Sequence, residues 1–132
     1  MQSISGIVYL IIIACLLPYV FTVVAKMAGG FKREDNQNPR EFLAKTTGLA
    51  ARANAVQQNS FESLPLFIAA VLMAEYMVIP QVVVMMFGIA YIVLRIIYGI
   101  CCLSDWAILR SIVRMLSLLC PICILLMVIK LT

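Results

Sequence analysis

The sequence contains no histidine, and only 12% of its 132 residues are charged. A metal ion bound by histidine and a histidine general base are therefore both excluded. Apolar residues are in excess, since 64% of the chain is hydrophobic and its mean hydropathy is +1.08, whereas an ordinary soluble domain is about half apolar. A globule of this size buries only roughly two-thirds of its surface, so a soluble monomer is excluded.

The sequence also has no long run of basic residues and no even set of cysteines. The short basic pair Lys32 and Arg33 is followed at once by Glu34 and Asp35, so no nucleic-acid partner is expected. The five cysteines are an odd number in a hydrophobic chain, which does not indicate a secreted disulfide framework.

Apolar runs of the length that a membrane span needs, about 20 residues, recur along the whole chain. They predict an all-α integral membrane protein, a four-transmembrane-helix bundle that forms a single domain over residues 1–132. The predicted helices cover about 4–25, 42–76, 82–103 and 107–130. The charged stretch between the first two contains the turn signals Gly29, Gly30 and Asn38, Pro39, and we expect it to be the longest aqueous loop.

The basic residues are divided unequally between the two sides of such a bundle. Only Lys130 lies on the side of the two termini and the Pro80 turn. Because cytoplasmic loops carry an excess of Lys and Arg, we expect the long first loop to be cytoplasmic and both termini to lie outside. The seven basic residues on the loop side are Lys26, Lys32, Arg33, Arg40, Lys45, Arg110 and Arg114.

Several polar side chains fall at membrane depth, where a charge costs roughly 2.5 to 3.5 kcal/mol and usually has a function. On the second helix, Arg52, Asn59 and Glu62 lie within about 80° of one another. On the third helix, a second group of polar side chains lies along one face, and the fourth helix begins with two further arginines. The residues of these two helices are Arg95, Tyr98, Cys102, Arg110 and Arg114.

Bundling these helices predicts a cationic cleft near the cytoplasmic surface. The four arginines outnumber the one clear carboxylate, Glu62, and an arginine holds a carboxylate in a bidentate fork. The pattern therefore favours a small polycarboxylate as guest. The alternative is that Glu62 and an arginine form a buried ion pair whose only role is to hold the helices together.

The stretch from Arg52 to Phe67, RANAVQQNSFESLPLF, closely resembles the second-helix signature of the membrane-associated proteins in eicosanoid and glutathione metabolism, the MAPEG family. The loop DNQNPR at 35–40 looks like that of the bacterial branch. Arg95 and Tyr98, followed by Arg110 and Ser111, resemble the family's third-helix and fourth-helix pattern. The resemblance covers roughly residues 35–117.

The resemblance implies a homotrimer in a bacterial inner membrane that binds glutathione as co-substrate between subunits, with no metal. The implied activity is a glutathione transferase or peroxidase that uses an Arg-stabilised thiolate on lipophilic electrophiles or lipid hydroperoxides. Arg110 matches the residue that activates the thiol and is the implied catalytic residue. The implied glutathione-binding residues are Lys26, Arg52, Asn59, Glu62, Arg95 and Tyr98.

Two departures from the family pattern leave alternatives open. Ala55 replaces a glutathione-binding arginine of the eicosanoid enzymes, and Cys102 replaces a frequent second tyrosine, so a different thiol, or a non-enzymatic lipid-binding relative, remains an alternative. Cys120 and Cys123 have the spacing of a thiol–disulfide pair and suggest a quinone-linked thiol oxidoreductase. The competing interpretation is that both are small apolar side chains around Pro121.

Overall fold

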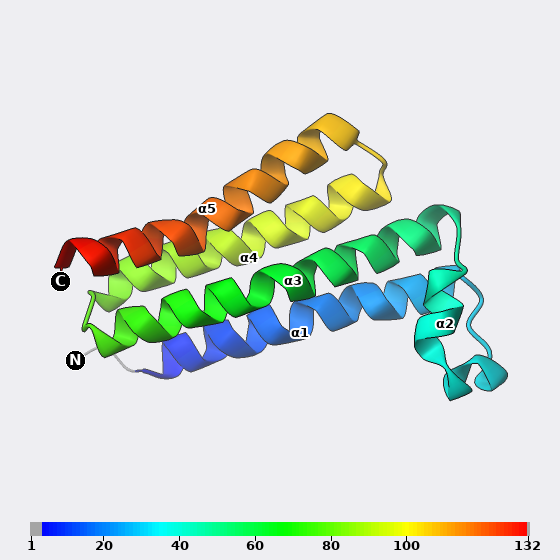
Figure 1. Ribbon diagram of the computed structural model, residues 1–132, viewed down its shortest axis with the longest axis horizontal. Helices are drawn as coiled ribbons and strands as arrows, with labels where there is room; N and C mark the ends of the chain where they lie inside the picture. Colours follow the sequence, from blue (N-terminus) through cyan, green and yellow to red (C-terminus); the bar gives the residue numbers. More distant parts are fainter. Residues whose placement is uncertain (1–3, 132) are drawn as a thin grey trace.

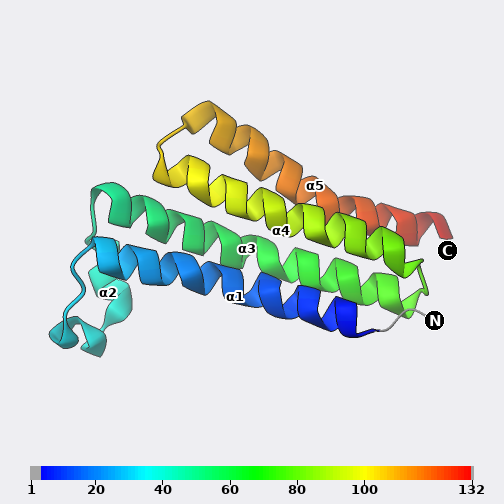
Figure 2. The same cartoon turned by 180° about the vertical axis from the view of Figure 1, so that it is seen from behind.

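The computed structural model describes residues 4–131, which are almost entirely helical (Figure 1). The described residues contain no strand, so the all-α prediction is confirmed. Four long helices lie side by side, each antiparallel to the next along the chain (Figures 1 and 2). In chain order the elements are α1 (Ser5–Ala28), η1 (Arg33–Gln37), α2 (Pro39–Ala44), α3 (Gly48–Tyr76), α4 (Gln81–Leu103) and α5 (Ala107–Leu131).

The helix predicted over 42–76 is divided in the structure, and its boundary was wrong. Asn38 caps α2 by accepting a hydrogen bond from the Glu41 N–H at 3.2 Å, with Pro39 in the favoured first helical position. The chain then leaves the helix, and Gly48 begins α3 with a φ of +62°, a left-handed conformation that glycine adopts readily. The helix that carries the polar residues therefore starts at Gly48.

The predicted aqueous loop begins later than expected and contains two short helices, η1 and α2. Helix α1 continues to Ala28, so Lys26 lies in its last turn and not in the loop. Inside the loop, Lys45 Nζ lies 3.0 Å from Glu41 Oε1 across one turn, and the lysine lowers the pKa of the Glu41 carboxyl below its usual range.

Three helices, α1, α4 and α5, are each long and apolar enough to cross a membrane. In α1 the buried residues recur every three or four positions, which is the period of one helix face. The opposite face of α1 is apolar yet exposed, as at Val20 and Val23, which suits contact with lipid. The other long helix, α3, is apolar only beyond Leu64, so a fourth span stays a prediction.

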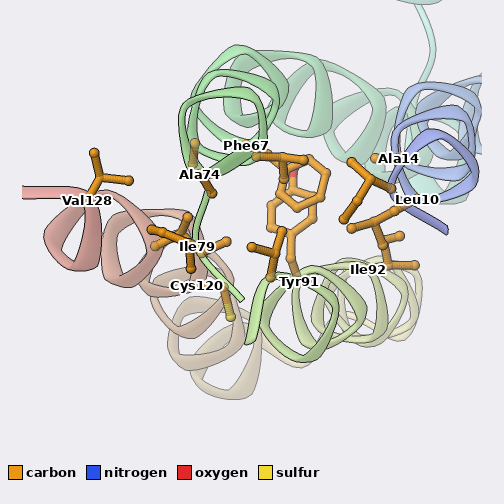
Figure 3. Close-up of a cluster of buried hydrophobic side chains, with 14 residues drawn as sticks. Leu10, Ala14, Phe67, Ala74, Ile79, Tyr91, Ile92, Cys120 and Val128 are labelled. Carbon is orange, nitrogen blue, oxygen red and sulfur yellow. The ribbon is translucent and has the colours of Figure 1, made fainter. Parts of the chain in front are cut away.

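The half of the bundle near the termini has a dense apolar core (Figure 3). Its centre is the ring pair of Phe67 on α3 and Tyr91 on α4, stacked with centroids 4.2 Å apart and planes 10° from parallel. Leu10 and Ala14 of α1 flank this pair on one side, and Cys120 of α5 closes the other. The core thus ties all four long helices together at this end.

At the loop end, α5 leans away from the bundle. Figures 1 and 2 show its Ala107 end further from α3 than its C-terminal end. Over its first three turns most side chains are exposed, and Val113 and Ser117 are the first that are buried. The first half of α5 therefore contributes few side chains to the interior of the bundle.

Two glycines of α4 allow α1 to approach closely. A Cβ added at Gly88 would lie 2.2 Å from Leu10 Cδ2, and one added at Gly99 would lie 2.1 Å from Phe21 Cζ. Small residues at helix contacts are typical of membrane bundles, in which van der Waals packing replaces the hydrophobic effect.

Gly99→Ala is expected to lower the free energy of unfolding by about 1 to 3 kcal/mol, because the new methyl group must displace the Phe21 ring. Gly6→Ala is the matched control, since its Cβ would meet Met85 at an ordinary 3.6 Å. Unfolding in mixed micelles with increasing denaturing detergent measures both variants. Equal stabilities of the two variants would show that the α1–α4 contact is not tight at Gly99.

Candidate functional site

The guanidinium of Arg95 lies inside the protein, where α3, α4 and α5 meet. Arg95 is 1% exposed and sits roughly 12 Å along α4 from the end of that helix. Its Nη2 donates to Asn59 Oδ1 at 2.8 Å and to Ser60 Oγ at 2.9 Å, both on α3. Its Nη1 donates to Ser117 Oγ of α5 at 3.3 Å.

The neighbours of Arg95 are arranged to receive its hydrogens. The Ser117 hydroxyl donates to the Arg114 carbonyl at 2.8 Å, which leaves the Ser117 oxygen free to accept from Arg95. The guanidinium carbon lies 4.5 Å from the centre of the Tyr98 ring, a favourable cation–π distance. Within the described residues, Arg95 Nε is buried and has no hydrogen-bond partner.

No carboxylate compensates this buried charge in the part of the chain that the structure describes. Across residues 4–131 the single ion pair is the surface pair Lys45–Glu41, while Glu62 is exposed. The alternative of a structural ion pair between Glu62 and an arginine is therefore wrong for these residues. Because an unpaired buried charge is costly, Arg95 creates a site that an anion would stabilise.

A hollow of about 170 Å³ lies between α3 and α5. Arg95 does not line it, but Arg95 donates a hydrogen bond to Asn59, which does. The hollow places the predicted residues Asn59 and Glu62 on one wall and Arg114 on the other. The residues that line it are Asn59, Glu62, Ser63, Arg114 and Leu118. The walls thus offer an amide, a carboxylate and a guanidinium next to the buried charge.

A larger hollow, of about 540 Å³, lies at the loop end against η1 and α2. Its lining includes three carboxylates, Glu34, Asp35 and Glu41, against one lysine, Lys45. None of the arginines predicted for the anion site lines this hollow, so its size does not make it a candidate for an anionic guest.

The remaining predicted arginines lie near the same end of the bundle. Arg52 is half-buried in α3, and its buried Nε has no partner among the described residues. Arg110 is half-buried in the first turn of α5, within electrostatic range of Cys102. Arg114 is exposed and within electrostatic range of Arg95. These arginines therefore lie in the halves of α3 and α5 that are nearer the loop end, and their gathering around one anion stays a prediction.

Two further predicted positions have different outcomes. Tyr98 is buried against the Arg95 guanidinium and packs against Cys102 and Val113. Arg95, Tyr98 and Cys102 therefore share one face of α4, the third predicted helix. Lys26 is not brought to Arg95, because its Nζ lies 4.6 Å over the Phe31 ring in the loop.

Ser60 and Ser117 hold the guanidinium of Arg95, yet the sequence analysis did not select them. Both are small hydroxyl residues that are buried among apolar side chains, as Ser63 also is. A buried arginine needs several hydrogen-bond acceptors. That requirement could have indicated that small hydroxyl residues on neighbouring helices bind Arg95. Which serines supply these acceptors depends on how the three helices pack.

The cysteine pair shows no feature that favours redox chemistry. All five cysteines are free thiols, and Cys120 is buried with its sulfur 3.6 Å from the Leu116 carbonyl oxygen. Cys123 is half-buried one turn further along α5. These positions agree with packing roles around Pro121.

Comparison with known proteins gives one match that covers nearly the whole chain. The model of the MAPEG family matches residues 6–130. No curated protein and no solved structure matches the chain.

Ser117→Ala is expected to cost about 1 to 3 kcal/mol of stability, because it leaves a buried guanidinium N–H without its acceptor. The matched control is Ser111→Ala on the same helix. Its hydroxyl also donates to a carbonyl of the preceding turn, that of Ala107, but lies at an exposed position. Thermal unfolding of the detergent-purified variants distinguishes them, and equal losses would mean that the Arg95 contact adds no stability.

Proposed function

The chain belongs to the MAPEG family, and on that premise we propose that it is a glutathione-dependent membrane transferase or peroxidase acting on lipophilic electrophiles or lipid hydroperoxides. The family includes glutathione transferases and peroxidases. The observation that carries the proposal is the buried guanidinium of Arg95, which has neutral acceptors and no carboxylate in the described chain. Such a site favours an anionic guest.

Glutathione has the groups that this site would recognise. Its two carboxylates suit the guanidinium groups of Arg95 and Arg52, because arginine holds a carboxylate in a bidentate fork. Its ammonium group suits the exposed carboxylate of Glu62, and its amides suit Asn59. Lys26 keeps a proposed role only if it leaves Phe31 or acts on a neighbouring subunit.

The site in one chain is incomplete, which supports assembly as a homotrimer with the guest held between neighbours. A hollow of about 170 Å³ is smaller than typical ligand pockets, which run about 300 to 1,000 Å³. Gln58 and Glu62 are exposed on the outer face of α3, where contact with lipid would be costly. A second copy that covers this face would enlarge the site and allow α3 to act as the fourth span.

Arg110 is the residue that we propose as activator of the thiol. An ordinary thiol has a pKa of about 8.5 and is mostly protonated at neutral pH. A guanidinium beside the sulfur favours the thiolate, and lowering the pKa by two units requires about 2.7 kcal/mol. The lipophilic second substrate would reach this sulfur from the bilayer, with the loop end of the bundle on the cytoplasmic side.

Glutathione binding is the direct test. Calorimetry on the detergent-purified oligomer should give saturable binding that Asn59→Ala and Glu62→Gln weaken more than they weaken assembly, because both side chains line the hollow. Glu75→Gln is the matched control, a carboxylate on the same helix outside the hollow. No heat at millimolar glutathione would reject the proposal and leave a non-enzymatic lipid-binding relative as the better interpretation.

Arg110→Ala should lower the turnover number by about 10² to 10³ while changing the half-saturation for glutathione far less. The reason is that Arg110 acts on the charge at sulfur, whereas the guest's carboxylates stay with Arg52 and Arg95. Ultraviolet difference spectra should show less bound thiolate, and Arg110→Lys should restore part of the activity.

Arg114→Ala is the parallel control for Arg110, since it removes a guanidinium one turn further along α5. If Arg114→Ala alone lowers turnover and the thiolate signal, the activating role belongs to Arg114. Unchanged turnover in Arg110→Ala would contradict the assignment of Arg110.

A further inference from the structure

Tyr91 places a hydroxyl group inside the apolar core, one helical turn from Arg95. Its side chain is 2% exposed, and its ring stacks on Phe67 (Figure 3). The Tyr91 hydroxyl lies 2.8 Å from Ser63 Oγ of α3. This bond joins α3 to α4 and belongs to none of the interactions that hold the Arg95 guanidinium directly.

The direction of the Tyr91–Ser63 bond follows from the other partner of Ser63. The Ser63 hydroxyl donates its one hydrogen to the Ser60 carbonyl at 3.1 Å. The Ser63 oxygen must therefore accept, and the Tyr91 hydroxyl donates. Ser60 thus accepts from Ser63 with its carbonyl and from Arg95 Nη2 with its hydroxyl, so Tyr91 is linked to the site through one shared residue.

The two contacts form neighbouring rungs between antiparallel helices. On α4, Tyr91 and Arg95 are one helical turn apart. On α3, Ser63, the partner of Tyr91, is about one turn from the Arg95 acceptors Asn59 and Ser60. A slip of α3 against α4 by a single residue would move the acceptors by about 1.5 Å, too far for Arg95 to keep both oxygens. The hydrogen bond between Tyr91 and Ser63 fixes the register of α3 against α4 from within the apolar core.

We propose that Tyr91 is a positioning residue for the anion site, holding Asn59 and Ser60 in register with Arg95. The proposal rests on the proposed function for the identity of the guest, and on the hydrogen bonds alone for the positioning. The role suits a tyrosine, since its ring is stacked on Phe67 (Figure 3) while its hydroxyl reaches Ser63 of α3.

Tyr91→Phe tests the role cleanly, because it removes the hydroxyl and keeps the stacked ring. Its first readout needs no guest: nuclear magnetic resonance of the guanidinium nitrogens in the detergent-purified oligomer labelled with ¹⁵N-arginine. A held guanidinium gives separate, slowly exchanging Nη signals, which we expect for Arg95 in the parent and expect to merge or broaden in Tyr91→Phe. Comparison with Arg95→Lys assigns the signals.

The second readout is glutathione affinity by calorimetry. Interhelical hydrogen bonds in membranes contribute about 0.6 to 1.7 kcal/mol, so Tyr91→Phe should weaken binding by about 3- to 20-fold. Tyr19→Phe is the matched control, a hydroxyl deletion on an exposed tyrosine whose ring meets Phe61 edge-on and whose oxygen has no hydrogen bond among the described residues. It should change neither readout.

The outcomes separate the two proposals. Unchanged Arg95 signals in Tyr91→Phe overturn the positioning role, whatever the affinity does. Merged signals with weaker binding support it. If the parent binds no glutathione, the proposed function fails, while the Arg95 signals still decide the positioning role. Should Tyr91→Phe not fold, Ser63→Ala removes the same bond from the α3 side and is judged by the same signals.

Discussion

A positive charge held inside an apolar bundle is the constraint on which the rest of this structure depends. Burial of Arg95 would be prohibitive without acceptors, and three helices each contribute to meeting that need through Asn59, Ser60, Ser117 and the Tyr98 ring. Because these partners are neutral, the charge is solvated but not cancelled. An anion would therefore be stabilised next to this charge in a way that a structural ion pair would have prevented.

This constraint explains the unusual composition of α3. A helix that supplies acceptors to Arg95 and walls to the adjacent hollow cannot be apolar in that half, so α3 differs from the three helices that are plainly able to cross a membrane. The division of the bundle follows from it. One end is a dense apolar core around Phe67 and Tyr91, and the other contains Arg95 and the hollow between α3 and α5.

Much of the site was predictable because its chemistry conflicts with its surroundings. Arginines, amides and a carboxylate inside hydrophobic runs are conspicuous, and helical spacing alone placed Asn59 near Glu62 on one helix and Arg95 with Tyr98 on one stripe of another. Sequence reasoning failed where local and tertiary preferences compete. Residues 42–47 were expected to continue a helix, but the Asn38 cap and the left-handed Gly48 divide it into two. The contact of Lys26 with the ring of Phe31 was likewise not expected from the sequence, because it depends on how the chain turns after α1.

The sequence by itself determined that this chain is an all-helical membrane protein with more arginines than carboxylates in its polar helix segments, because hydropathy and helical period are properties of consecutive residues. Only the tertiary structure decided how that charge is held. Whether Glu62 pairs with an arginine, and which serines accept from Arg95, depends on distances between helices far apart in the chain. Those distances are set by packing at residues such as Gly99 and Phe21, whose contacts leave no trace in a linear pattern.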